Sequence, residues 1–417
     1  MTQSLPTQTA AVAPTTLEAP PRRFQVVLVL GLLISLGPLS IDMYLPAFPE
    51  ISDEFTAAES QVQLTLTGML LGLAFGQLVI GPLSDAFGRK RPLVVGLSVH
   101  ALASVLCLLA PSVEVLAGVR IVQGFAGAAV TVTAMAMVRD QFAGIEVART
   151  MSRLMLVMGA APMLAPTLGS QVLRWSDWRG IFGVLAVVAL ALVTLALFAL
   201  RETLPPARRR PARVRASLAT YRSLLADRAF LAVALIGGLM MAAMFSYIAG
   251  SSYVFQDGFG ASEQQFAVIF GLNALALITA TQVNPTLLRR WRIMDVMTAA
   301  MVVSALASTS LVVLGATGVG GIAGAVVPLV VVLACNGLVS PNVPALALNR
   351  HGEAAGSAAA VLGFLQFGIG GAVAPVVGLF DSVTTVPMGV VMASVVLTAL
   401  ALMVFVVRRD EQVRTFA

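Results

Sequence analysis

The stretch GPLSDAFGRKR, residues 81–91, is a short charged connection between two long apolar runs. Gly88 allows a tight turn there, and Arg89 and Lys90 suit the headgroup level at the inner face of a membrane. Asp85 can cap the next helix or pair with a base, and Asp140 is a candidate partner for either base. We interpret the stretch as a latch between moving helices; the alternative is a charge cluster that only sets topology. The latch comprises Gly81, Asp85, Gly88, Arg89, Lys90 and Asp140.

The composition of the chain around this stretch is that of a membrane protein. Of 417 residues, 58% are hydrophobic and 11% are charged, whereas soluble domains carry about 25% charged residues. One membrane-crossing helix needs about 20 apolar residues, and the apolar content suffices for about twelve crossings. These figures exclude a soluble globular enzyme, a disordered chain and a nucleic-acid binder.

Proline, glycine and charged clusters divide the chain into twelve apolar spans. The sequence therefore predicts an all-α membrane protein with twelve transmembrane helices in two pseudo-symmetric six-helix bundles. We expect a disordered tail over 1–23, bundles over 24–200 and 229–408, a cytoplasmic linker over 201–228 and a tail over 409–417. The spans are 24–45, 61–82, 92–110, 113–138, 148–173, 179–200, 229–254, 263–288, 293–315, 319–347, 354–380 and 386–407.

The distribution of basic residues tests this count. If both termini are cytoplasmic, 23 of the 26 Lys and Arg residues fall on inner segments. Only Arg174 and Arg179 fall on outer loops, and Arg120 lies inside a span. A wrong helix count would scramble this partition, so the positive-inside rule favours twelve helices with both ends inside. The outer loops carry the acids Glu50, Asp53, Glu54, Glu59, Asp257, Glu263 and Asp381.

The two halves of the chain resemble each other. GAAPMLAPTLG, residues 159–169, aligns with GIGGAVAPVVG, residues 368–378, in the fifth span of each half. The 81–91 connection has a decayed counterpart, NPTLLRRWR, from residue 284. Two six-helix halves related by an axis along the membrane normal are a known transporter plan.

Asp42 is the one acidic residue that lies well inside an apolar span. A carboxylate there must be paired, hydrated or protonated, which suits a group that takes up and loses protons. The alternative is a cap at the outer helix end, because Pro46 follows closely. Arg120 is the only base inside a span, with Gln123 one turn later on the same face. It either responds to a carboxylate in a cavity or braces loops.

Two further sets of residues suit a transporter. In the fifth span, Gly159, Pro162, Pro166 and Gly169 allow close packing and bending; this is a candidate hinge or a static packing face. Candidate residues for a substrate cavity are Tyr44, Gln63, Gln123, Phe245, Tyr247, Asn273, Asn336 and Gln366, and Gln77, Tyr253 and Asn342 share their pattern. Alternatively, each of these residues makes an interhelical hydrogen bond or fills the core.

Several kinds of chemistry find no support in the residues. Cys107 and Cys335 lie in apolar runs and are too isolated for a metal pair. His100 and His351 are too far apart for a metal cluster. The only lysine, Lys90, does not stand in a phosphate-binding loop. We therefore expect no metal, no cofactor and no enzymatic activity, with energy coming from elsewhere.

The motifs resemble those of the major facilitator superfamily. GPLSDAFGRK resembles its motif A, RIVQGFAGA from Arg120 resembles motif B, and the 159–169 run resembles the motif C of drug–proton antiporters, with Ala165 where glycine is usual. PLSIDMYLPAFPEI, ETLPP and AGSAAAVLGFLQFGIGG are similar to the bicyclomycin/chloramphenicol-resistance (Bcr/CflA) subfamily. The resemblance covers about residues 24–408.

This resemblance implies a proton-driven exporter of small amphipathic drugs in the bacterial inner membrane, acting as a monomer within the lipid. It implies that Asp42 and Arg120 serve proton coupling and substrate response, and that protons and a small molecule are the partners. An alternative on the same fold is a proton-coupled transporter of an amino acid, peptide or sugar. A channel or a receptor also remains open.

Overall fold

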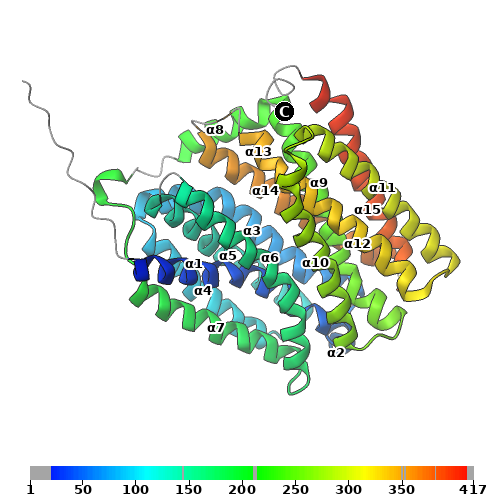
Figure 1. Ribbon diagram of the computed structural model, residues 1–417. Coiled ribbons are helices and arrows are strands. Elements are labelled where there is room, and N and C mark those ends of the chain that lie inside the picture. The colour runs from blue at the N-terminus through cyan, green and yellow to red at the C-terminus, as the bar shows by residue number, and fades with distance from the viewer. Residues whose placement is uncertain are drawn as a thin grey trace, which may run out of the picture.

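The computed structural model describes residues 20–142, 145–209, 214–348, 351, 354–380 and 382–410. Helices make up nearly all of these segments, and they form two bundles that stand side by side (Figure 1). The predicted 1–19 part of the tail, Arg210, Arg213, Arg350, Asp381 and Arg414 lie outside the described residues. The chain is thus the predicted all-α membrane protein.

The first bundle contains six long helices, and a short turn and helix join the first two. They are α1 (Pro20–Asp42), η1 (Leu45–Ala47), α2 (Phe48–Phe55), α3 (Glu59–Phe87), α4 (Lys90–Leu108), α5 (Val113–Gln141), α6 (Ile145–Leu173) and α7 (Trp178–Ala199). α3 and α4 pack on α5, α7 packs on α4, and α1 packs on α6.

The second bundle repeats this plan. Its elements are α9 (Arg228–Tyr253), η3 (Val254–Gly258), α10 (Glu263–Leu287), α11 (Ile293–Thr317), α12 (Gly321–Val339), α13 (Asn342–Leu348), α14 (Ala355–Val373), η5 (Ala374–Phe380), α15 (Thr385–Phe405) and η6 (Val407–Arg409). The connection between the bundles holds η2 (Pro206–Arg208) and α8 (Val214–Ala226).

The predicted spans agree with the helices except at a few boundaries. Over the described residues, eleven helical segments are long and apolar enough to cross a membrane, and α6 is the twelfth long helix. α3 continues through Pro82 to Phe87, beyond the predicted end at residue 82. It stops at Gly88, whose φ of +88° favours glycine. The span predicted over 319–347 is broken between α12 and α13.

The two ends of the bundles differ in charge. We call the end that holds Arg89, Arg139, α8 and Arg228 the basic end, and the end that holds η1, α2 and η3 the acidic end. α3 contacts α14, and α6 contacts α10, across the interface between the bundles. The bundles meet near α2 and lie farther apart beside α8 (Figure 1).

Candidate functional site

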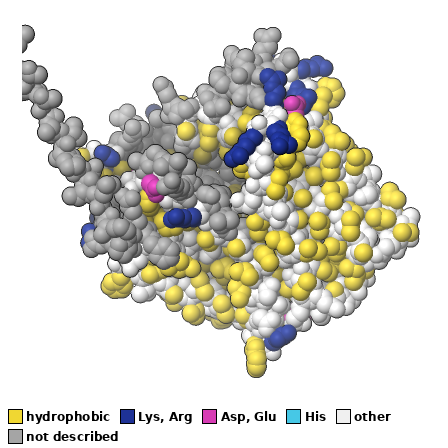
Figure 2. Space-filling model, viewed as in Figure 1, with side chains coloured by type: hydrophobic (Ala, Val, Ile, Leu, Met, Phe, Trp, Pro, Cys, Tyr) yellow, Lys and Arg dark blue, Asp and Glu magenta, His cyan; other side chains and the backbone are white. Residues whose placement is uncertain are grey.

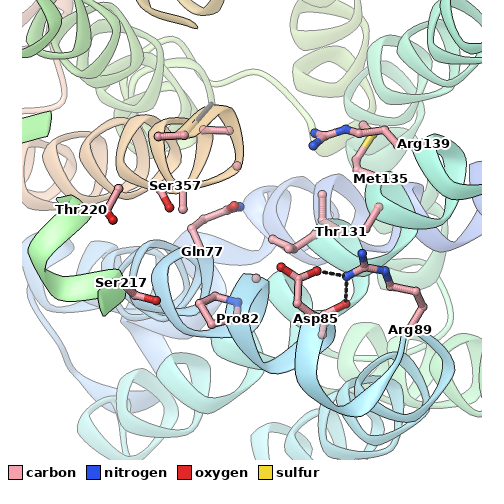
Figure 3. A pocket seen from close by; sticks show the side chains of 18 of the residues that line it. Gln77, Pro82, Asp85, Arg89, Thr131, Met135, Arg139, Ser217, Thr220 and Ser357 are labelled. Atoms are coloured by element: carbon pink, nitrogen blue, oxygen red, sulfur yellow. Dashed lines mark hydrogen bonds and ion pairs between the residues drawn. The ribbon is translucent and has the colours of Figure 1, made fainter. Parts of the chain in front are cut away.

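A cavity of about 630 Å³ lies between the bundles at the basic end. Figure 3 shows the hydroxyl groups of Ser217, Thr220 and Ser357 and the amide of Gln77 around it, with Arg139 pointing inward. The wall therefore combines residues of both bundles with residues of α8. The other residues of the wall are Gly81, Pro82, Ser84, Asp85, Arg89, Thr131, Val132, Met135, Ala136, Asp140, Tyr221, Ala354, Gly356, Ala359 and Ala360.

At the acidic end, direct hydrogen bonds join the bundles. The Gln63 amide donates to the Ala249 carbonyl over 3.3 Å, and its oxygen accepts from the Gly378 backbone N–H over 3.1 Å. The Thr67 hydroxyl donates to the Gly371 carbonyl over 2.8 Å. Gln256 reaches the Pro46 carbonyl at 3.1 Å. The cavity thus opens toward the basic end while the acidic end is held together.

The predicted latch residues form one network around Arg89. Its Nη1 donates to the Asp85 carboxylate over 2.6 Å and to the Ser84 hydroxyl over 2.9 Å, and its Nε donates to Asp140 over 2.8 Å. Burial opposes the charge of Arg89, but these carboxylates outweigh it and raise the pKa of the guanidinium. α3, the α3–α4 turn and α5 are therefore tied together at the cavity mouth (Figure 3). Lys90 instead donates to the Leu197 carbonyl.

The α4 N-terminus is capped by a residue that the sequence analysis quoted only within ETLPP. The Glu202 carboxylate accepts from the backbone N–H groups of Arg89 at 2.8 Å and Lys90 at 3.2 Å. Thr203 beside it donates to Asp140 over 3.0 Å. The start of the connecting segment is thus part of the latch. Glu202 lies 113 positions from Arg89, so no local pattern connects the two.

Replacement of Glu202 by glutamine is expected to weaken this cap in a pH-dependent way. Partial burial opposes ionisation of Glu202, but the N–H groups of Leu204, Arg89 and Lys90 outweigh it and lower its pKa. A lowered carboxylate pKa stabilises the folded state above the unfolded pKa, and the effect is lost as pH falls through the folded pKa. We expect a loss of about 1 kcal/mol, the usual value of a cap, at pH 7 and none in strong acid. Thermal unfolding in detergent at pH 7 and in acid measures this loss of stability, with Asp53→Asn as control. A loss of equal size at the two pH values would contradict the prediction.

Arg120 is fully buried in the first bundle. Its Nη1 donates to the Ser40 carbonyl over 2.8 Å and to the Gln123 side chain over 2.7 Å, and its guanidinium lies 4.2 Å from the Tyr44 ring centre. Gln123, expected on the same helix face as Arg120, accepts one of these bonds. Arg120 Nε and Nη2 have no hydrogen-bond partner, and no ion pair among the described residues joins it to Asp42. The site therefore holds a buried cation that contacts two neutral oxygens and an aromatic face while two of its donor nitrogens stay unpaired.

A buried histidine belongs to the same network. His100 is fully buried, and its ring nitrogens lie 3.0 Å from the Ser40 hydroxyl and 3.2 Å from the Gln123 carbonyl. Gln123 in turn donates to Ser104 over 2.8 Å. α1, α4 and α5 are joined through these bonds, and Ser40 precedes Asp42 by two residues. One histidine in an apolar run carries no signal that would have identified this position.

Asp42 ends α1 and is only 3% exposed. Neither η1 nor α2 receives a side-chain cap bond at its N-cap residue, which disfavours the interpretation of Asp42 as a helix cap. Its Oδ1 is buried without a hydrogen-bond partner, as are the Tyr247 hydroxyl and the Asn273 Oδ1. The Asp42 charge interacts electrostatically with Tyr247, across the bundle interface. Buried polar atoms are normally hydrogen-bonded, so these three unpartnered atoms mark a candidate site for a proton or a polar ligand.

The structure places the other candidate cavity residues away from the 630 Å³ cavity wall. Gln63 belongs to the contact at the acidic end, and Tyr44 and Gln123 surround Arg120. In the second bundle, Phe245 packs near Phe367, Asn336 donates to the Met240 carbonyl, and Gln366 lies beside Gly237. Gln77, which shares the sequence pattern of these candidates, lies in the cavity wall. Contact between the candidate residues and a substrate stays a prediction.

The candidate hinge lies in α6, which continues as one helix through Pro162 and Pro166. Gly169 packs so closely on the turn after α1 that an added Cβ would collide with the Met43 carbonyl oxygen. Close packing is therefore one use of this run, directly beside Asp42. The surroundings of Gly159 lie outside what the structure describes, and bending of α6 stays a prediction.

Comparisons with known proteins place this geometry in a family. The family model described as Major Facilitator Superfamily matches residues 30–375. A Bacillus subtilis (strain 168) protein named uncharacterized MFS-type transporter YdgK is 38% identical over 89% of this chain and 92% of its own length. The bicyclomycin resistance protein homolog of Haemophilus influenzae is 31% identical over 91% of this chain and 95% of its own.

More distant matches agree on the fold. The multidrug resistance protein MdtL of Shigella dysenteriae is 30% identical over 61% of this chain and 64% of its own length. The nucleoside transporter NupG (D323A mutant) superposes with a TM-score of 0.74 at 15% identity, covering 92% of this chain and all of its own. The Escherichia coli xylose transporter XylE, in a partially occluded inward-open conformation, gives 0.72 at 15%, covering 93% and 98%. These structures share the fold of the chain.

Proposed function

Because this chain belongs to the Major Facilitator Superfamily, a family of membrane transporters and not enzymes, we propose that it is a proton-driven exporter. The observation that carries the proposal is the buried carboxylate of Asp42, which lies beside the interface of the two bundles without a hydrogen bond to its Oδ1. Among the described residues, Asp42 is the only aspartate or glutamate that is buried. Such a group suits reversible proton binding within the membrane.

We assign the basic end to the cytoplasm of a bacterial inner membrane, with both termini inside, because Lys and Arg gather on cytoplasmic loops. The cavity then faces the cytoplasm, where a drug enters it. Rocking of the bundles would separate the acidic-end contacts, expose the cavity outward and let a periplasmic proton reach Asp42. Return to the inward state would deliver the proton. One proton moving down 100 mV supplies about 2.3 kcal/mol.

The proposed substrates are small amphipathic drugs, similar to bicyclomycin or chloramphenicol. One relative is named a bicyclomycin resistance protein homolog and another a multidrug resistance protein. The wall offers Arg139, while its acids Asp85 and Asp140 are engaged by Arg89. A dicationic substrate would therefore lack counter-charges. We propose that the monomer is the working unit, without metal or cofactor.

A second candidate is proton-coupled transport of a small metabolite such as a sugar, amino acid or peptide. The hydroxyl groups of the cavity wall favour it, because such groups bind hydroxylated solutes well. Substrate-induced proton release by the purified protein separates the two functions. Release on adding chloramphenicol but not on adding sugars or amino acids supports drug export, and the reverse pattern supports the metabolite transporter.

Alternating access predicts that a wedge at the acidic end opens that end. An added Cβ at Gly378 would lie 2.8 Å from the Ser60 backbone nitrogen and 2.7 Å from the Gln63 side-chain oxygen, so the bundles must shift. We expect Gly378→Ala to increase severalfold the maleimide labelling of Ser251→Cys, a buried position near the acidic end of α9 that leaves the Gln63 contacts intact. Gly368→Ala is the control on α14, because its Cβ would meet only Ala74 at 3.9 Å. Equal labelling of both variants would argue against a separating contact here.

A further inference from the structure

A second hollow lies on the outer face of the second bundle, away from the cavity between the bundles. It has a volume of about 440 Å³ and lies between α10 and α12. Leu272, Leu275 and Val283 are 47%, 47% and 44% exposed, so the groove faces outward. Apart from the Thr279 hydroxyl its wall is apolar. The remaining residues of the wall are Ala276, Ala280, Leu287, Ala334 and Leu338.

The groove runs along α10 toward the basic end. From Leu272 to Leu287 the helix rises about 22 Å, whereas one leaflet occupies half of a hydrocarbon core about 30 Å thick. The groove is therefore long enough to hold an extended acyl chain through the leaflet on the basic side.

Three arginines lie where the groove ends. Arg289, Arg290 and Arg292 are exposed and follow α10 directly, and Trp291 between them is 54% exposed. Figure 2 shows Lys and Arg side chains gathered at the upper edge of a broad hydrophobic face, the same side of the molecule on which α10, α11 and α12 lie in Figure 1. Tryptophan is typical of the level where lipid headgroups begin. The nearby acid Asp295 pairs with Arg408 over 2.5 Å.

The internal repeat explains why these arginines are available. In the first half, Asp85 binds Arg89. When Asn284-Pro285 is aligned with Gly81-Pro82, the position of Asp85 is occupied by Leu288. The second half therefore retains the bases of the connection and lacks this acid. A phosphate group would supply the negative charge that the protein itself supplies in the first half.

We propose that this groove and the three arginines form a binding site for an anionic phospholipid. One acyl chain lies along α10 and α12 between Leu272 and Leu287, and the phosphate is held by Arg289, Arg290 and Arg292. Basic pockets between transmembrane helices on the cytoplasmic side recognise anionic headgroups in this way. The proposal depends on neither the substrate nor the proton coupling.

Quenching of Trp291 fluorescence by acyl-brominated lipids tests the site. The full chain is reconstituted in phosphatidylcholine nanodiscs that contain a small fraction of brominated phosphatidylglycerol or brominated phosphatidylcholine. The difference between the chain and Trp291→Phe isolates the Trp291 signal from those of Trp175 and Trp178. We expect half-maximal quenching at a mole fraction at least tenfold lower for phosphatidylglycerol. Equal quenching by the two lipids would overturn the proposal.

Two variants separate the headgroup and acyl parts of the site. Arg289→Gln/Arg290→Gln/Arg292→Gln should abolish the preference for phosphatidylglycerol. Arg215→Gln/Arg222→Gln/Arg228→Gln, which removes the same charge from exposed positions on and beside α8, should retain it. Ala276→Phe fills the groove with the arginines intact and should weaken quenching by phosphatidylglycerol severalfold. If the α8 variant loses the preference equally, or Ala276→Phe has no effect, the site is not the one proposed.

Discussion

Replacement of Asp42 by asparagine is expected to abolish uphill export while leaving the protein folded. The side chain keeps its shape, but it no longer ionises, so the proton gradient does no work on the substrate. One proton at 100 mV supports a concentration ratio of about fiftyfold, and we expect this ratio to fall to one. Substrate exchange at equal concentrations should persist, because it needs only the cavity and the rocking of the bundles.

Proteoliposomes with an imposed proton gradient measure both quantities, and substrate-induced proton release in detergent gives an independent readout. Asp53→Asn is the matched control, since Asp53 is an exposed aspartate on α2. A variant at Asp42 that still accumulates substrate uphill would show that another group carries the proton. Loss of exchange together with export would instead assign Asp42 to substrate binding.

Replacement of Arg120 by methionine is expected to separate function from stability. Its two charged hydrogen bonds, to Ser40 and Gln123, contribute about 1.5–3 kcal/mol each. Burying a guanidinium with no carboxylate partner costs several kcal/mol. These terms oppose each other, so we expect the free energy of unfolding to change by less than about 2 kcal/mol. Export should be lost, because the positive charge beside α1 is gone.

Resistance of a pump-deficient bacterial strain and thermal unfolding of the purified protein measure the two effects. Arg120→Lys retains the charge without the planar guanidinium and should recover part of the export. If Arg120 only braces the bundle, Arg120→Met will unfold the protein or, when it folds, confer full resistance. Full resistance of the folded variant would remove Arg120 from the transport mechanism, and unfolding would contradict the small change in stability expected here.

Local patterns were enough to predict much of this molecule. Apolar runs predicted the long helices, because a helix in lipid must be apolar over its whole length. Helical spacing also placed Gln123 on the same helix face as Arg120, three residues away, and Arg89, one of the candidate bases for Asp85, lies only four residues from it. The boundaries at Pro82 and between α12 and α13 could not be predicted in this way, because hydropathy alone does not identify a helix end.

What the sequence by itself determined is the set of helices, their buried Asp42 and Arg120, and the charges at their ends, since each depends on neighbours within a few turns. Only the tertiary structure decided that Arg89 meets Asp140, 51 positions away, that Glu202 caps α4, and that Gln63 joins the bundles instead of lining the cavity. These contacts depend on how each helix is rotated and where it crosses its neighbours. Small and apolar residues, which make up most of the packing faces, permit many such arrangements, and the energies that select one come from atoms brought together only in the folded chain.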